Sequence, residues 1–198
     1  MTANRAASIR ARLKQHPHTT KQDFNLTLTQ YGLERLLYRL SVSEHAPNFL
    51  LKGALLFQLW YGQSHRPTRD ADLLADVPAP TLRAYPKATV VTEKLHAVTV
   101  LGMTNTRMKD FFDLWVLLHD TTLDDAELRR AIEATFTRRQ TAMPAAQPIG
   151  LSDAFAEDAT KQVQWRAFLK KNRLQAMDLG NVISYVRERG QHLGFGST

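Results

Sequence analysis

The expected fold is built around residues 49–74, which read FLLKGALLFQLWYGQSHRPTRDADLL. An apolar run predicts a short buried strand over residues 49–51, and residues 53–60 have the composition of a helix. Residues 70–74 predict a second strand, in which Asp70 and Asp72 lie two positions apart. Because side chains alternate between the faces of a strand, both carboxylates would point the same way.

Two neighbouring carboxylates repel each other unless a divalent cation or basic groups lie between them. Mg²⁺ suits such a pair, since it takes hard oxygen ligands and shares them with substrate phosphates. Upstream, the small residues after Lys52 would let a backbone turn approach a triphosphate closely. A phosphate-binding turn followed by a strand with paired carboxylates is the layout of a nucleotidyltransferase site. The alternative is two solvated acids paired with Arg66 and Arg69.

Four motifs occur in a fixed order along the chain: K-G at 52–53, T-R-D-A-D-L-L at 68–74, E-K-L-H-A at 93–97 and N-T-R-M-K-D-F-F-D-L-W at 105–115. A lone D-x-D arises by chance in many chains, but the ordered set resembles the AbiEii-type nucleotidyltransferases. These are toxins of bacterial toxin–antitoxin pairs with a DNA polymerase β-like core. The resemblance covers residues 48–118 and extends weakly to 174. It implies an α+β fold, with a small nucleotidyltransferase-type sheet and a predominantly helical remainder.

By this resemblance, Asp70 and Asp72 are catalytic and hold Mg²⁺ against the phosphates of an NTP substrate. The residues expected to bind the nucleotide are Lys52, Gly53, Ala54, Thr68 and Arg69. Gly53 matches the phosphate-loop glycine of the family, whereas Ala54 stands where relatives often carry Gly or Ser. Arg69 would offer phosphate its fork of donors, or balance the two aspartates in the resting state.

A second block of the resemblance, residues 84–118, contributes Lys94 and Asp110 to the expected catalytic set. Lys94 would reach the triphosphate as a point charge; the alternative is an ordinary snorkelling lysine. Asp110 would orient the attacking hydroxyl, act as a base, or tie down Lys94 or Arg107. Asp113, on the same helix face at i,i+3, fits a local charge network better. His96 fits a structural histidine better than a base.

The basic composition favours a polyanionic partner, because the net charge is +7 and the pI is near 9.9. The resemblance implies that this partner is an RNA acceptor, such as a tRNA 3′ end. The alternative is that the excess charge only keeps the surface soluble. An exposed basic cluster is the RNA-contact candidate, with a solvated helix face as its alternative: Arg129, Arg130, Arg138 and Arg139. Aromatic residues at helical spacing are expected in the core rather than as a base-stacking platform: Phe112, Trp115, Phe136, Trp165 and Phe168.

Residues 75–84 lack an expected segment. In the family, further strands follow the D-x-D strand, and one of them carries a third carboxylate. Here D-A-D-L-L runs almost directly into VPAPTLRAYP, so the catalytic domain looks shortened. The alternative function is therefore a catalytically impaired homologue that only binds nucleotide, RNA or an antitoxin, since two-metal chemistry usually needs three carboxylates.

The remaining pattern is helical. Helices are predicted over residues 3–15, ended by Pro17, and 21–43, with Thr20 as N-cap. Further helices are predicted over 88–101, 107–118, 124–139, 160–171 and 178–189. Asp124 and Ser152 are expected N-caps, and residues 190–198 are expected to be loose. We expect a nucleotidyltransferase-like core over 1–120 and a C-terminal helical region over 121–198.

Zero cysteines exclude disulfides, thiolate zinc sites and cysteine nucleophiles, and fit a cytoplasmic protein. No apolar run is long enough for a bilayer, so no membrane partner is expected. The basic N-terminus lacks the apolar region of a secretory signal. The expected partners are therefore an NTP, an RNA acceptor and a cognate antitoxin.

Overall fold

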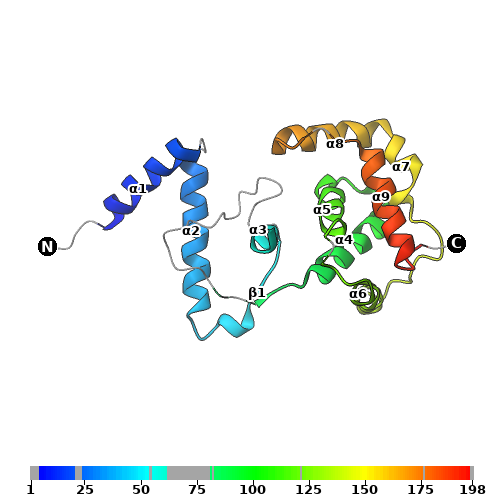
Figure 1. Ribbon diagram of the computed structural model, residues 1–198, viewed down its shortest axis with the longest axis horizontal. Helices are drawn as coiled ribbons and strands as arrows, with labels where there is room; N and C mark the ends of the chain where they lie inside the picture. Colours follow the sequence, from blue (N-terminus) through cyan, green and yellow to red (C-terminus); the bar gives the residue numbers. More distant parts are fainter. Residues whose placement is uncertain are drawn as a thin grey trace. The chain divides into compact units, whose positions relative to one another are not determined.

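The computed structural model describes residues 5–20, 24–53, 55–61, 81, 83–120, 122–175 and 177–196. The chain forms two compact units, Met1–Tyr85 and Pro86–Thr198 (Figure 1). The boundary between these units lies after Tyr85, and the division that the sequence suggested after residue 120 stays a prediction. No described helix has the length and apolar character needed to cross a membrane.

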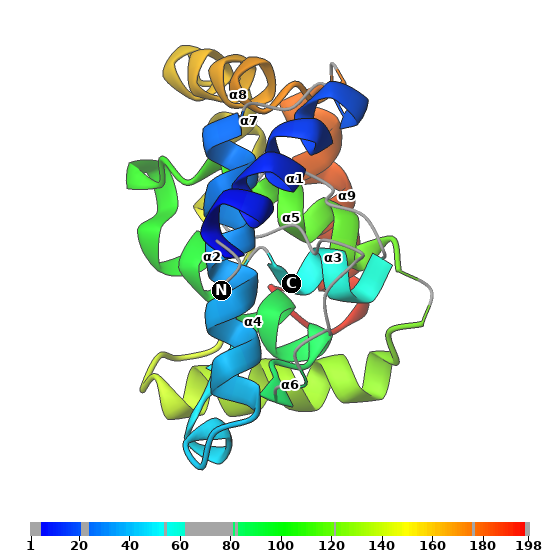
Figure 2. The same cartoon turned by 90° about the vertical axis from the view of Figure 1, so that its left-hand side faces the viewer.

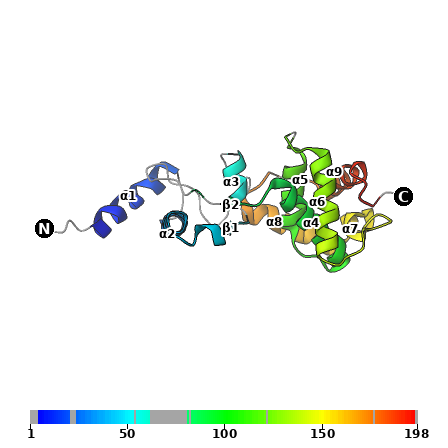
Figure 3. The ribbon, with the colours of Figure 1, turned by 90° about the horizontal axis from the view of Figure 1, so that it is seen from below.

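The first unit combines helices with a small parallel sheet. Its helices are α1 (Arg5–Thr20), α2 (Phe24–Ser41), the 3₁₀ turn η1 (Ala46–Asn48) and α3 (Leu55–Tyr61). Strand β1 (Leu50–Leu51) pairs in parallel with β2 (Arg83–Ala84), so that Leu50 faces Arg83 and Leu51 faces Ala84 (Figure 3). A small sheet within a mostly helical chain confirms the predicted α+β class. The strand predicted over 70–74 lies outside the described residues.

Two predictions at the first helices are wrong. α1 continues through Pro17 to Thr20. A proline inside a helix removes one backbone hydrogen bond, here the bond to the carbonyl of Leu13, and this loss does not end α1. Thr20 is therefore the last residue of α1 and does not cap α2, which begins at Phe24.

The second unit contains helices and loops but no strand in its described residues. It comprises α4 (Lys87–Leu101), η2 (Gly102–Thr104), α5 (Met108–Leu118), α6 (Asp125–Arg138), η3 (Ile149–Leu151), α7 (Asp153–Glu157), α8 (Ala159–Asn172) and α9 (Leu179–His192). α4 packs on α5 and α6, while α5 also packs on α8 and α9 (Figure 2). Apolar residues at helical spacing close the core, among them Val91, Leu95, Phe111, Leu114, Ile132, Phe155, Trp165 and Val182.

Local signals in the second unit behave as predicted. Asp124 accepts a bond from the N–H of Glu127 at 2.8 Å, and Ser152 accepts one from the N–H of Phe155 at 3.2 Å. Of the predicted core aromatics, Phe112, Phe136 and Trp165 are buried, whereas Trp115 and Phe168 are only half-buried. The rings on α5 and α8 form one cluster. The ring centroids of Phe112 and Phe168 lie 5.9 Å apart, those of Trp165 and Phe168 lie 5.6 Å apart, and those of Phe112 and Trp115 lie 6.4 Å apart.

The C-terminal segment is packed, so the prediction that residues from 190 onward are loose is wrong as far as residue 196. Phe195 is only 2% exposed and meets the ring of Phe136 at 5.7 Å. Its N–H donates to the carbonyl of Gly190 at 2.9 Å. Gly194 and Gly196 have φ values of 81° and 66°, which let the chain turn back onto α6.

We expect Phe195→Ala to lower the free energy of unfolding by about 3 kcal/mol, because it empties a buried aromatic site. Urea unfolding monitored by circular dichroism measures this loss. Val163→Ala is the control, since Val163 is exposed on α8, and it should change stability by less than about 0.5 kcal/mol. A Phe195→Ala variant as stable as the control would mean that the segment is loose in solution.

Candidate functional site

The described part of the site is formed by two adjacent helices, α4 and α5. The residues preceding α5 set where it begins: the side chain of Asn105 accepts a bond from the N–H of Arg107 at 2.9 Å. α5 then presents Asp110 and Asp113 at i,i+3 on one face, toward α4. On α4, Lys94 belongs to the turn that also carries the buried Leu95.

Lys94 bridges the two aspartates. Its Nζ donates to Asp110 Oδ1 at 2.9 Å and to Asp113 Oδ2 at 2.8 Å. The side chain of Lys94 is 14% exposed, and those of Asp110 and Asp113 are 0% and 2% exposed. The ammonium group of Lys94 is therefore not solvated, as it would be in a snorkelling lysine. Lys94 and Asp110, the two residues of this block that the resemblance marks as catalytic, are in direct contact.

Arg107 completes this ion-pair network from the solvent side. Its Nε lies 2.7 Å from Asp110 Oδ2, as an ion pair without the alignment of a hydrogen bond. Half of its side chain is exposed, so further guanidinium donors can meet a ligand. Of the three roles considered for Asp110, the contacts correspond to tying down Lys94 and Arg107. Asp113 belongs to the same network, as the i,i+3 spacing suggested.

The turn after β1 has the conformation that the sequence predicted. Gly53 has a φ of 97°, which residues with a Cβ rarely adopt. The N–H of Leu56 donates to the carbonyl of Gly53 at 3.1 Å, and α3 begins at Leu55. The ammonium group of Lys52 lies over the ring of Tyr85, 4.9 Å from its centroid. A strand, a glycine turn and a helix therefore follow one another here.

The remaining predicted site residues lie outside the described residues: Ala54, Thr68, Arg69, Asp70 and Asp72. In the part of the chain that is described, no group of three or more His, Cys, Asp or Glu side chains could hold a metal. Asp110 and Asp113 are both matched by cations. The pair expected to hold Mg²⁺, Asp70 and Asp72, stays a prediction.

His96 has a structural environment. Its Nε2 is 2.9 Å from the hydroxyl of Thr141, and its ring meets that of Phe136 edge to face at 5.1 Å. Burial, followed by the Arg139 guanidinium, lowers the pKa of His96 below 6.5, while Glu93 acts in the opposite direction. The contacts agree with the structural role that the sequence favoured.

This environment predicts a pH dependence of stability. A pKa that is lower in the folded chain means that the unfolded chain takes up the proton first. The contribution of the neutral His96 to the free energy of unfolding is then fully present above about pH 6.5 and is lost as the pH falls below that value. We expect His96→Gln to show a smaller drop in Tm between about pH 7.5 and pH 5.5 than the wild type. The exposed His45→Gln variant should follow the wild type; an equal drop in His96→Gln would assign the effect to other groups.

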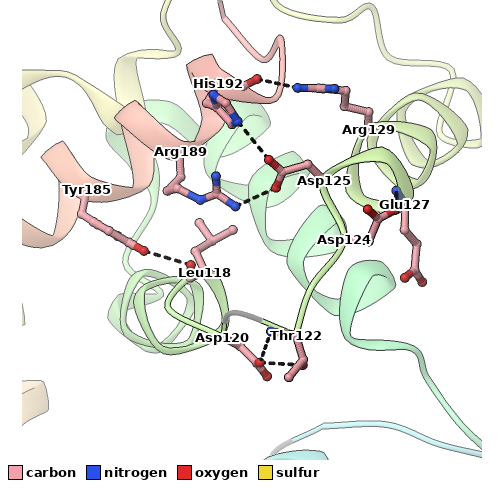
Figure 4. Close-up of polar contacts among 10 residues, drawn as sticks. All are labelled: Leu118, Asp120, Thr122, Asp124, Asp125, Glu127, Arg129, Tyr185, Arg189 and His192. Carbon is pink, nitrogen blue, oxygen red and sulfur yellow. Dashed lines mark hydrogen bonds and ion pairs between the residues drawn. The ribbon is translucent and has the colours of Figure 1, made fainter.

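A second polar network, which the sequence did not indicate, links α6 to α9 (Figure 4). Asp125 pairs with Arg189 at 2.8 Å and with His192 at 2.9 Å. Arg129 donates to the carbonyl of His192 at 3.1 Å. The hydrogen bond from Arg189 is the main cause that lowers the pKa of Asp125. The signal in the sequence was weak, because these partners are more than 60 positions apart.

The predicted RNA-contact cluster on α6 is largely engaged within the unit. Arg129 belongs to the network of α6 and α9. Arg138 and Arg139 lie 3.6 Å and 3.5 Å from the carboxylate of Glu93 on α4. Arg130 is exposed. Two of these four cations, Arg138 and Arg139, are therefore partly neutralised by one shared carboxylate.

One protein-family model matches the chain, described as "Nucleotidyl transferase AbiEii toxin, Type IV TA system". It matches residues 35–78 and 74–185. The two segments overlap over residues 74–78, directly after the D-x-D motif, where the segment expected from the family is missing. Neither a curated protein nor a solved structure matches the chain.

Proposed function

Because the chain belongs to the AbiEii nucleotidyltransferase toxin family of type IV toxin–antitoxin systems, we propose that it transfers a nucleotidyl group from an NTP to RNA. The acceptor would be an RNA 3′ end, and the reaction would need Mg²⁺ and take place in the cytoplasm. A family of this type implies a cognate antitoxin as a further partner.

The observation that carries the proposal is the contact between the two motifs of the second block. Burying Asp110 and Asp113 with Lys94 costs desolvation energy, and replacing such a group by apolar residues is often neutral or stabilising. A catalytic role for the network explains why the chain keeps it. Lys94 has one ammonium donor beyond the two in use, and Arg107 is half exposed. Both cations are thus fixed in advance for charge on a phosphate.

Each residue then has a distinct part in the proposed reaction. The backbone N–H groups around Gly53 would bind phosphate oxygens. Lys94 and Arg107 would stabilise negative charge on the triphosphate, and Asp110 would hold both of them in place. Asp70 and Asp72 would bind Mg²⁺, which when present neutralises charge on the leaving pyrophosphate and orients the α-phosphorus.

The test is a transfer assay with purified protein, total RNA, Mg²⁺ and each α-labelled NTP in turn. We expect label to appear in RNA with at least one NTP, and to disappear when EDTA removes the metal. Label in RNA despite EDTA would contradict the metal requirement. Absence of label with every NTP and RNA would contradict the transferase proposal.

A non-catalytic descendant is the second candidate, and the two-segment family match favours it. The match breaks where further strands and a third carboxylate are expected. Isothermal titration separates the candidates: nucleotide binding in Mg²⁺ without any transfer would identify a binding protein. Transfer to RNA would exclude this reading.

A further inference from the structure

Basic side chains gather at the C-terminal half of α8. Arg166, Lys170, Lys171 and Arg173 lie within eight positions, and all four are exposed. α8 itself, Ala159–Asn172, contains no acidic residue. We call these four residues the α8 basic cluster; in Figure 1, α8 is orange, and this end lies away from α7.

The pairing of charges sets this cluster apart from the rest of the second unit. Within the described residues, none of its four side chains forms an ion pair or hydrogen bond. Most other cations of the unit are engaged: Lys87 with Asp120, Lys94 and Arg107 with Asp110, Arg138 and Arg139 with Glu93, Arg187 with Asp153, and Arg189 with Asp125. Uncompensated positive charge is thus concentrated on one segment.

The cluster is held on a rigid support. The opposite face of α8 is anchored by the buried Trp165 and Leu169, and the indole N–H of Trp165 donates to the carbonyl of Met177 at 2.7 Å. Arg166 and Lys170 follow at i and i+4, which places them on one side of the helix, and Arg173 comes directly after the helix end. A fixed row of cations suits a repeating polyanion better than a single acidic side chain.

Helix stability alone does not explain the cluster. Lys170 and Lys171 occupy the last turn, where the helix dipole favours cations. Arg166 lies further back, outside the reach of that effect. Arg173 has a φ of 54° at a position where glycine is the favourable residue. The chain thus keeps a cation at a backbone position that disfavours it.

We propose that the α8 basic cluster is the surface on which the RNA acceptor docks through its phosphate backbone. The proposal deepens the proposed function, from which it takes RNA as the polyanion, and it replaces the α6 arginines as the contact site. Nothing in it requires nucleotide or metal, so binding can be measured apart from transfer.

The experiment compares two variants of equal charge. The first is Arg166→Gln/Lys170→Gln/Lys171→Gln; the control is Arg10→Gln/Arg12→Gln/Lys14→Gln on exposed positions of α1. Binding of fluorescently end-labelled tRNA is followed by polarisation over a series of salt concentrations, without NTP or Mg²⁺. We expect the α8 variant to bind tRNA at least about tenfold more weakly than the wild type. The slope of log K against log[salt] should become less negative by about two. The control should stay within about twofold of the wild type.

A single variant separates docking from structure. Arg173→Gly removes one charge and also relieves the disfavoured φ. We expect weaker tRNA binding together with a higher Tm, so that lost affinity cannot be ascribed to unfolding. A higher Tm with unchanged tRNA binding would overturn the role of Arg173 in docking.

The remaining outcomes also decide. Equal losses in the α8 variant and the α1 control would show that total charge drives binding, and would overturn the proposal. Binding of tRNA by the α8 variant at wild-type affinity would also overturn the proposal. This holds even if the variant binds phosphatidylserine vesicles or an acidic protein more weakly than the wild type does. If the wild type binds tRNA through α8 but transfers no label, docking stands and the proposed reaction fails.

Discussion

Replacing Lys94 with methionine should abolish nucleotidyl transfer and lower the free energy of unfolding of the second unit by about 3–5 kcal/mol. The side chains of Asp110 and Asp113 are fully or almost fully buried, and they share the ammonium group of Lys94. Methionine fills a similar volume but removes the ammonium group that the two carboxylates share, so that they repel each other more strongly. Chemical denaturation measures the loss of stability, and the labelled-RNA assay measures the activity.

A double variant distinguishes a catalytic lysine from a structural one. In Lys94→Met/Asp113→Asn, Asp110 keeps Arg107 as its partner, and the amide that replaces the carboxylate of Asp113 carries no charge. We expect most of the lost stability to return, while transfer stays absent because the cation is still missing. Recovery of transfer along with stability would show that Lys94 only holds the two helices together.

The helices of the second unit could be predicted because their apolar residues recur at helical spacing. α4 follows Val91, Leu95 and Val98, all of which are buried. Caps such as Asp124 marked where helices begin. The turn at Gly53 could be predicted too, because a glycine between an apolar strand and a helix has few other roles.

Other features depend on tertiary contacts that no local pattern reveals. β2 has only two residues, Arg83 and Ala84, and it forms because they pair with β1. The glycines after α9 suggested a loose end, yet their positive φ values return Phe195 to the core. The spacing placed Asp110 and Asp113 on one helix face, and Lys94 and Arg107 were candidate partners of Asp110, but the spacing did not show that Lys94 also meets Asp113. The packing of α4 on α5 decides this.

Asp70→Asn is expected to reduce transfer by about a thousandfold or more. Asparagine has nearly the same shape as aspartate but lacks the charge that would bind Mg²⁺ beside Asp72. Nucleotide binding should therefore lose its dependence on Mg²⁺ in isothermal titration, while Tm should stay close to that of the wild type. A large fall in Tm would instead assign Asp70 a structural role.

Glu44→Gln is the matched control for this variant. It also replaces a carboxylate with its amide in the first unit, and the side chain of Glu44 is 88% exposed. Its stability and its transfer rate should remain within about twofold of the wild type, as expected for a surface substitution.

The initial rate of label transfer from NTP to RNA, measured for the wild type, Asp70→Asn and Glu44→Gln at equal concentrations of folded protein, tests the proposed chemistry most directly. Transfer by the wild type and by Glu44→Gln, with Asp70→Asn at background, is the predicted result. Transfer by Asp70→Asn at the wild-type rate would contradict a reaction that depends on the paired carboxylates.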